Sequence, residues 1–292
     1  MTKLGGFLLV LCLFFPLVSK AQDNSEGLTC AAAQKSYRFL SIDVPNALFT
    51  AARGINDEGT VSGVYSDITG IYHGFLWSDD EFTPIDFSSS TATSAGGINA
   101  RDDVVGDYND LAGIDHGFLL RHGRFSTIDF PREPNSACYA VNNALQIVGV
   151  YFDVQGMVHG FFLKDDRYQT YDVPGSTETW PTGINDSGQI VGKYDEPLGG
   201  HGFLLDDRKL TTIDFPGGHG TWARGISECG TIVGKYKDNN QLTHGFVLRG
   251  NKFMTLDFPG AQSTLGMSIN SRGWIVGTYT DAGGVQHGFL AK

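Results

Sequence analysis

The chain has 292 residues, a formal net charge of −11 and no run of Lys and Arg. An acidic chain without basic clusters lacks the electrostatic surface that nucleic acids and anionic membranes require. We therefore expect neither a nucleic acid nor, once the N-terminal segment has been removed, a membrane among its partners.

The first 21 residues are predicted to be a signal peptide. Lys3 supplies a short positive start, and residues 7–18 form an apolar segment that is too short to span a bilayer comfortably. The small residues before Gln22 suit cleavage near Ala21. The sequence thus predicts export to the periplasm or the extracellular space, with a retained membrane anchor as the alternative. Residues 22–36 are polar and aperiodic, and we expect them to form a flexible leader.

From residue 37 to its end the chain repeats itself every 42 or 43 residues. A His-Gly-Phe tripeptide begins at His73, His116, His159, His201, His244 and His287. An aspartate, usually within Ile-Asp-Phe-Pro, recurs in step at Asp43, Asp86, Asp129, Asp172, Asp214 and Asp257. Repeats of this length are typical of stacked or circular supersecondary units.

Each repeat contains four strand-like segments rich in β-branched and aromatic residues. Residues 50–56, 61–65 and 73–76 are examples of the first three segments, and residues 125–131 are an example of the fourth. Gly, Pro, Asn and Asp separate the segments, which is the pattern of strands and turns. Four antiparallel strands in a repeat of this size are typical of a β-propeller blade.

The phase of the repeat distinguishes a closed ring from an open β-solenoid. Residues 37–44 form a lone fourth strand, whereas the C-terminus ends with the other three, at 264–270, 274–279 and 287–290. A ring gains from this offset because its first and last strands can pair and remove its edges. The sequence therefore predicts an all-β, six-bladed propeller over residues 37–292, closed by pairing of residues 37–44 with the C-terminal blade.

The repeated unit combines G-I-N-x-x-G-x-I-V-G-x-Y, H-G-F-L and I-D-F-P-G, as in residues 183–194 and 201–217. It resembles the secreted repeat family known as the HAF-type extracellular repeat. The resemblance covers residues 37–290 and implies an exported repeat protein with no established reaction. Gly replaces the Ala of His-Ala-Phe in every copy, and two copies have Asp102 and Leu145 in place of a turn glycine.

The repeated His and Asp are predicted to form cross-strand pairs, because in every full copy the histidine precedes the aspartate by 13 residues. His287 has no downstream aspartate, so we expect it to pair with Asp43 across the closure. Such pairs could be catalytic or metal sites, or structural clips. Third strands lie on the order of 15 Å from the axis, so the six histidines cannot converge on one metal. The sequence favours clips, and predicts no metal and no cofactor.

Two further sets of polar residues occupy turns. The asparagines that end the first strand, Asn56, Asn99, Asn142, Asn185 and Asn270, are predicted to be Asx-turn residues. The loop between second and third strands carries Asp67, Asp110, Asp153, Asp238 and Asp281. Calcium is one interpretation of these loops. A turn aspartate is favoured because each loop offers only one or two acids.

Candidate site residues come from the two positions of the innermost strand at which the copies diverge. One position reads Ala51, Ser94, Ala137, Trp180, Trp222, Leu265, and the next reads Arg53, Gly96, Tyr139, Thr182, Arg224, Met267. Glu178 and His219 stand in adjacent loops. The predicted ligand-binding residues are Trp180, Trp222, Arg53, Arg224, Tyr139, Glu178 and His219, grouped near one mouth of the channel. Packing between blades is the alternative interpretation of these side chains.

Three functions follow from this pattern. The chain carries no catalytic motif such as G-x-S-x-G or H-E-x-x-H, so no catalytic residue is predicted. The leading hypothesis is a secreted binding module for carbohydrate or for another exported protein. The alternatives are a secreted polysaccharide lyase or glycoside hydrolase with an axial site near Glu178, and a purely structural repeat protein.

Overall fold

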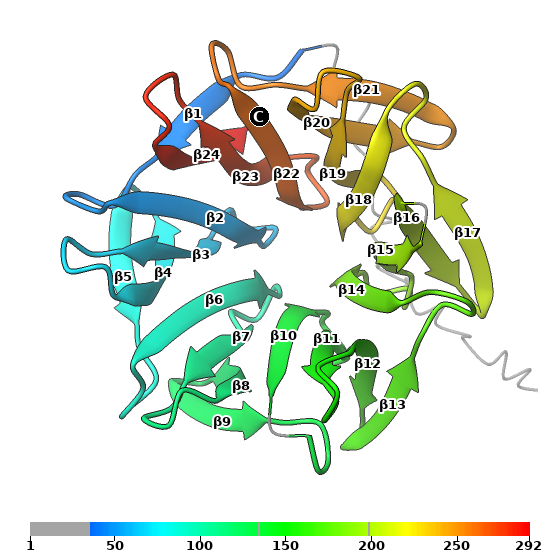
Figure 1. Cartoon of the computed structure of the whole chain (residues 1–292). Helices are drawn as coiled ribbons and strands as arrows, with labels where there is room; N and C mark the ends of the chain where they lie inside the picture. Colours follow the sequence, from blue (N-terminus) through cyan, green and yellow to red (C-terminus); the bar gives the residue numbers. More distant parts are fainter. Residues whose placement is uncertain (1–35, 134, 198) are drawn as a thin grey trace, which may run out of the picture.

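A computed structural model describes residues 36–133, 135–197 and 199–292. The predicted signal peptide and all but the last residue of the predicted leader lie outside this part of the chain. Within it, all regular elements are strands, which form six four-stranded antiparallel sheets arranged in a ring (Figure 1). The predicted six-bladed propeller is confirmed.

Each blade is named here by its place in the ring, and its strands run outward from the axis in sequence order. Blade 1 comprises β2 (Phe49–Ile55), β3 (Val61–Ser66), β4 (Tyr72–Ser78) and β5 (Glu81–Ile85). Blade 2 comprises β6 (Ala92–Ile98), β7 (Val104–Asn109), β8 (Asp115–Arg121) and β9 (Arg124–Ile128). Blade 3 comprises β10 (Ser136–Val141), β11 (Ile147–Phe152), β12 (Val158–Lys164) and β13 (Arg167–Tyr171).

The other half of the ring has the same order. Blade 4 comprises β14 (Glu178–Ile184), β15 (Ile190–Glu196), β16 (Gly199–Asp206) and β17 (Lys209–Ile213). Blade 5 comprises β18 (His219–Ile226), β19 (Ile232–Lys237), β20 (Thr243–Arg249) and β21 (Lys252–Leu256). Blade 6 comprises β22 (Ser263–Ile269), β23 (Ile275–Thr280), β24 (Gln286–Ala291) and, as its outer strand, β1 (Phe39–Ile42).

Blade 6 joins the two ends of the chain. β1 pairs antiparallel with β24, with Leu40 opposite Leu290. Arg38 and Lys292 extend this pairing by exchanging two backbone hydrogen bonds of 2.8 and 2.9 Å. The paired strand is shorter than the predicted segment 37–44, because its last residues already turn toward blade 1. An outer strand from the other end of the chain covers the edge of β24 and gives blade 6 the same four strands as the other blades.

The core lies between neighbouring blades, and the repeated Phe and Gly build it. All six phenylalanines of His-Gly-Phe are fully buried. Each packs over the glycine of the second strand: a Cβ on Gly192 would lie 2.6 Å from the Phe203 ring and 2.1 Å from the Trp180 carbonyl oxygen. The hydrophobic clusters combine adjacent blades, as where Val191 of blade 4 packs with Ile232 of blade 5. The conserved spacing of the repeat therefore encodes the contact between one blade and the next.

In four blades the Tyr of the second strand also stacks between neighbouring blades. In blade 2 the ring of Tyr108 stacks on Phe87 of blade 1 with centroids 3.7 Å apart, and its hydroxyl bonds to Thr127 at 2.9 Å. Phe215 and Tyr236 repeat the stack between blades 4 and 5 at 3.5 Å. Stacked and hydrogen-bonded, these tyrosines fill the space that the blades leave as they diverge from the axis.

The two missing turn glycines have a conformational consequence. Asp102 and Leu145 adopt φ angles of 59° and 57°, the left-handed conformation that the equivalent Gly188 reaches at 80°. Aspartate tolerates this region because its side chain can bond locally, whereas leucine does not. The turn of blade 3 is therefore the more strained, and the fold is unchanged.

Candidate functional site

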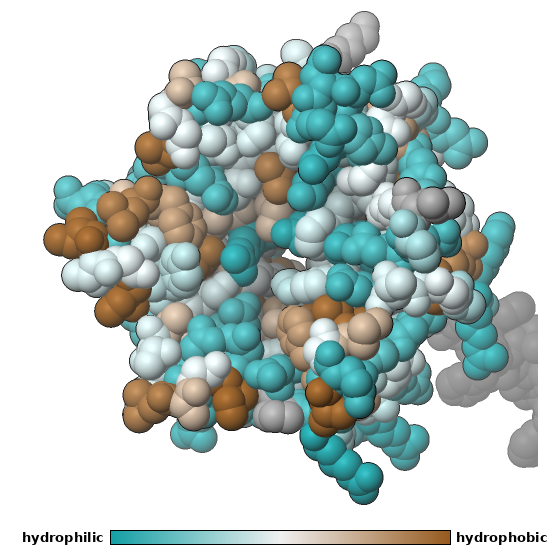
Figure 2. Space-filling model, viewed as in Figure 1, coloured by the Kyte–Doolittle hydropathy of each residue, from teal (hydrophilic) through white to brown (hydrophobic). Residues whose placement is uncertain are grey.

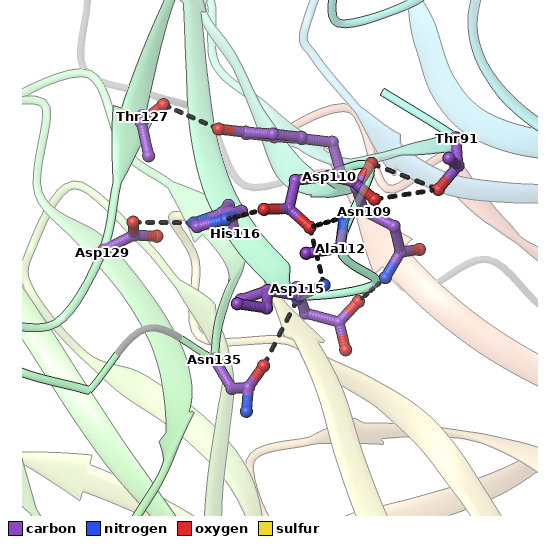
Figure 3. A network of polar contacts seen from close by, with 11 residues as sticks. Thr91, Asn109, Asp110, Ala112, Asp115, His116, Thr127, Asp129 and Asn135 are labelled. Carbon is purple, nitrogen blue, oxygen red and sulfur yellow. Dashed lines mark hydrogen bonds and ion pairs between the residues drawn. The ribbon is translucent and has the colours of Figure 1, made fainter. Parts of the chain in front are cut away.

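Carboxylates of the same blade hold the repeated histidines, and in five blades they contact both ring nitrogens. In blade 2, Nδ1 of His116 lies 2.8 Å from Asp129, and Nε2 lies 3.6 Å from Asp110 (Figure 3). The imidazole stacks on Tyr108, with ring centroids 5.1 Å apart. Both ring nitrogens and one ring face are thus occupied by the blade itself.

The same pairing occurs in all six blades. The Nδ1–carboxylate distances are 2.9 Å for His73–Asp86, 2.8 Å for His159–Asp172, 2.9 Å for His201–Asp214, 2.8 Å for His244–Asp257 and 2.7 Å for His287–Asp43. The predicted pairs are therefore present, including the pair across the closure. The structure supports their interpretation as clips.

The neighbouring carboxylates raise the pKa of three of these histidines. Burial lowers the pKa of His116, but the hydrogen bonds and charges of Asp129 and Asp110 outweigh it, so the pKa is raised. The pKa values of His159 and His287 are raised for the same reason. In blade 1, Asp67 lies on the Nε2 side of His73. The pKa of Asp67 is lowered to about 2, chiefly by a hydrogen bond from Thr69.

The Asp67-type loops are hydrogen-bonded turns. Oδ1 of Asp110 accepts the backbone N–H groups of Ala112 at 2.8 Å and Ile114 at 2.9 Å. Asp281 accepts two equivalent amides at 2.8 and 2.9 Å. Over the part of the chain that the structure describes, no group of three or more His, Cys, Asp or Glu could hold a metal ion. The turn interpretation is confirmed, and the second oxygen of each aspartate contacts the histidine of its blade.

One mouth of the axial channel is closed by the repeated asparagines. Oδ1 of Asn142 accepts two amides of its own turn, as predicted for an Asx turn, and its Nδ2 donates to the Asn185 carbonyl of the next blade at 3.0 Å. The following residue is also used between blades: Asp186 accepts the Asn143 amide at 2.7 Å. The cavity at this mouth is only about 110 Å³. Its polar groups serve the contacts between blades.

A larger cavity of about 340 Å³ lies in the channel beyond a layer of divergent side chains. The space-filling view shows an opening at the centre of the ring (Figure 2). Side chains from all six blades reach this cavity: Arg53, Asp107, Asp115, Ala137, Tyr139, Phe152, Thr182, Trp222, Arg224 and Met267, with Gly96. At the position of Arg53 the six innermost strands carry five different residue types, and only arginine occurs twice, in blades 1 and 5.

Blades 4 and 5 form an aromatic and cationic wall. The guanidinium of Arg224 lies 4.0 Å from the centroid of the Trp222 ring. Lys235 and Lys193 place their ammonium groups 5.1 and 5.0 Å from the same ring. Trp180 packs edge-on to Trp222, with centroids 6.2 Å apart. Cations at these distances from an indole face interact favourably with it.

The positive charge on this wall is only partly balanced. Lys193 pairs with Asp195 at 2.6 Å. Among the described residues, neither Arg224 nor Lys235 forms an ion pair within 4.0 Å. Burial, with the neighbouring Arg53 charge, lowers the pKa of Arg224 to about 10. Burial, with the charges of Arg224 and two lysines, lowers the pKa of Lys235 to about 8.

Blade 2 supplies an acidic wall. Asp115 accepts a hydrogen bond from Asn109. Burial raises the pKa of Asp107 to about 6, against the opposing charge of Arg53. Arg53 donates to Ser94 at 2.5 Å and so faces the same wall. The cavity is consequently polarised, with carboxylates on blade 2 and unpaired cations on blade 5.

The structure brings most of the predicted site residues together. Arg53, Tyr139, Trp222 and Arg224 line the cavity. Trp180 lies behind them, with its ring 6.1 Å from that of Tyr139, which agrees with the packing alternative for this residue.

Glu178 and His219, which were expected in loops, are the first residues of β14 and β18 and do not join this group. The carboxylate of Glu178 accepts the indole N–H of Trp180 at 2.9 Å. His219 is exposed and contacts Gln241 at 3.0 Å. Neither residue lines the cavity.

The sequence reasoning missed the contribution of the second strand. Asp107, Lys193 and Lys235 occupy the position after the glycine in V-x-G-x-Y, directly opposite Ser94, Trp180 and Trp222. The other copies have Val64, Val150 and Thr278 there. Divergence at this position was a readable signal, since residues opposite one another in a sheet share a face.

Comparison with known proteins gives the fold and no more. No protein-family model and no curated protein matches the chain. TolB from Acinetobacter baumannii matches with a TM-score of 0.59 at 12% identity, over 80% of this chain and 64% of that one. A mutant of AofleA from Arthrobotrys oligospora matches with 0.54 at 9%, over 87% and 86%. A gluconolactonase from Xanthomonas campestris matches with 0.52 at 12%, over 88% and 89%. At such identities a shared propeller does not carry a shared activity.

A search of residues 36–133, 135–197 and 199–292 for helices finds none that is long and apolar enough to cross a membrane.

Proposed function

We propose that the chain is an exported propeller of the HAF-type repeat class, and that it binds carbohydrate in the channel cavity. The observation that carries the proposal is that repeated and divergent polar residues occupy different places in the structure. The repeated ones, such as His116 and Asn142, are used within or between blades. The divergent ones, such as Arg224 and Asp107, surround one cavity.

The cavity has the properties of a site for a small polar ligand. Its volume of about 340 Å³ is at the low end of the roughly 300–1,000 Å³ that ligand pockets occupy. Its lining combines the aromatic rings of Tyr139 and Trp222 with carboxylates and guanidinium groups. Rings offer a flat apolar surface and the charged groups bond to hydroxyls, which is the combination that a sugar requires. Export, which the sequence of residues 1–21 predicts, would expose the protein to glycans.

A glycan array probed with the labelled protein tests this proposal. Trp222→Ala removes the ring beside Arg224 and should abolish the signal. Trp77→Ala is the matched control, because it removes an indole of the same size that packs against the core of blade 1 and does not line the cavity. Retained binding by Trp222→Ala, or the absence of any glycan ligand for the wild type, would contradict the proposal.

A second candidate, docking of another exported protein, has its own observation. The tips of the Asp67-type loops carry apolar side chains that are strongly exposed, with Ile68 at 75%, Leu111 at 80% and Val154 at 84%. Exposed apolar groups gathered on loops are a feature of protein interfaces. Replacing all three by Ser should abolish such docking without affecting glycan binding.

The lyase or hydrolase centred on Glu178 is not favoured. The carboxylate of this residue is bonded to Trp180 and does not line the cavity.

A further inference from the structure

The cavity carries a charge asymmetry that a neutral sugar does not explain. The chain as a whole is acidic, with a net charge of −11. Nevertheless, its axial wall on blades 4 and 5 concentrates Arg224, Lys193 and Lys235 around a single indole ring. A buried cation is costly unless an anion accompanies it.

The four cations near the cavity differ in how their charge is compensated. Lys193 is paired with Asp195. Arg53 forms no ion pair within 4.0 Å among the described residues, but it donates to Ser94, which lies opposite Asp107, and its charge opposes the rise in the pKa of that acid. The carboxylates that remain do not reach Arg224 or Lys235, for which no ion pair forms among the described residues.

Of these two groups, Arg224 is the one that reaches the cavity. Its Nε donates to the sulfur of Met267 at 3.4 Å, which is a weak acceptor, and its Cζ lies 4.0 Å from the centroid of the Trp222 ring. These two contacts restrain the guanidinium. A restrained guanidinium without a carboxylate partner is suited to bind a carboxylate or phosphate through two parallel hydrogen bonds.

The opposite wall has the complementary chemistry. Asp107 and Asp115 line the cavity and offer only acceptor oxygens when they are ionised. They repel an anion but accept hydrogen bonds from hydroxyl groups. A ligand that fills the cavity must therefore present an acid at one end and hydroxyl donors at the other.

From this arrangement we infer that the cavity selects sugars that bear a carboxylate, with the acid group on Arg224 and the sugar hydroxyls on Asp107 and Asp115. The inference rests on the proposed function and specifies its ligand class. Uronic acids have this chemistry: a carboxylate on one side of the pyranose ring and hydroxyl donors on the other. Lys235 adds positive charge behind the aromatic ring without contacting the ligand.

Calorimetric titration of the wild-type protein with glucuronate, glucose and a glucuronate-containing disaccharide tests the inference. The acid and the neutral sugar differ only in the carboxylate. We expect the acid to bind at least about tenfold more tightly, the range that one charged hydrogen bond supports. Free glycine, inorganic phosphate and a short acidic peptide serve as competitors that carry an acidic group but no sugar, and none should displace the disaccharide at equal concentration.

Two matched variants separate charge from shape. Arg224→Met keeps most of the side-chain length and should remove the preference for glucuronate. Arg167→Met is its control, because Arg167 is exposed on the outer strand β13, and the preference should persist. Asp107→Asn removes a repelling charge and should keep or strengthen glucuronate binding.

The outcomes distinguish the inference from the proposed function. Equal affinity for glucose and glucuronate would overturn the inference and leave carbohydrate binding in place. The same holds if Arg224→Met keeps the preference. Displacement by glycine, phosphate or the peptide would assign the site to another class of anion and overturn both. Binding of no sugar at all would also overturn both.

Discussion

Completing the ring of asparagines should stabilise the protein. The side-chain amide of Asn270 donates to the Asn56 carbonyl at 2.9 Å, and that of Asn185 donates to the Ser227 carbonyl at 3.2 Å. Blade 5 lacks this donor because it has Ser227, whose hydroxyl accepts the Thr231 amide at 3.2 Å. In blade 1 the donor is present, but Asn56 donates to the Asp102 carboxylate at 2.9 Å. Ser227→Asn therefore supplies the amide group that this position lacks.

The expected increase in the free energy of unfolding corresponds to one added hydrogen bond. The amide of the new asparagine would reach the carbonyl of Asn270, while its oxygen keeps the bond to Thr231. A net contribution of about 0.5–1.5 kcal/mol is typical of such a bond. For a domain of this size each kcal/mol shifts the melting temperature by roughly 2–4 °C. We expect a rise of about 1–6 °C, measured by differential scanning calorimetry and by urea titration.

A second variant, Asn185→Ser, tests whether the bond between blades is the cause of the stabilisation. Asn185→Ser removes the equivalent bond of blade 4, so it should lower the free energy of unfolding by a similar amount. If Asn185→Ser is destabilised while Ser227→Asn is no more stable than the wild type, the reasoning is refuted. The asparagine would then act through the turn of its own blade, and the bond between blades would contribute nothing.

Stability should fall as the pH rises from about 6.5 through the folded pKa of His116, because that pKa is raised and the stabilisation is present below the unfolded value of about 6.5 and lost above the folded value. In urea titrations His116→Gln should show a smaller fall, and an unchanged slope would contradict this. Asp43→Asn and His287→Gln should couple by up to about 1 kcal/mol in a double-mutant cycle, whereas strictly additive losses would mean that solvent screens the pair. Gly192→Ala should cost about 3 kcal/mol or prevent folding, because its Cβ would meet a carbonyl oxygen at 2.1 Å; a folded variant of wild-type stability would refute the packing argument. Trp222→Phe should change stability by less than about 1 kcal/mol, since the indole nitrogen is buried without a hydrogen-bond partner, while Trp222→Ala should cost about 2–4 kcal/mol; equal losses in circular-dichroism melts would contradict that assignment.

The repeat made the fold predictable in unusual detail. A strand is a local pattern, and six copies of that pattern average out its ambiguity. The pairing of His287 with Asp43 could be predicted because the ring obliges a partner missing from one end of the chain to come from the other. Strand ends were less accurate: the predicted fourth segment 125–131 extends beyond β9, which ends at Ile128. The residues after it turn toward the next blade.

The candidate site was only partly predictable. Arg53, Tyr139, Trp222 and Arg224 stood out because they break the repeat on the innermost strand. Glu178 and His219 do not line the cavity, because they begin β14 and β18 and lie at the ends of these strands rather than at the divergent positions. The acids and lysines of the second strand were missed because only the register of the sheet places them opposite the divergent positions.

By itself, therefore, the sequence determined the number of blades, their strand order, the closure and the roles of the repeated side chains. Each of these depends on a pattern that recurs at fixed spacing, and a recurring pattern constrains neighbouring blades in the same way six times. Tertiary structure alone decided which side chains share the axial cavity and which cations there lack a carboxylate. Those are relations between different blades at positions where the copies differ, so no period in the chain encodes them.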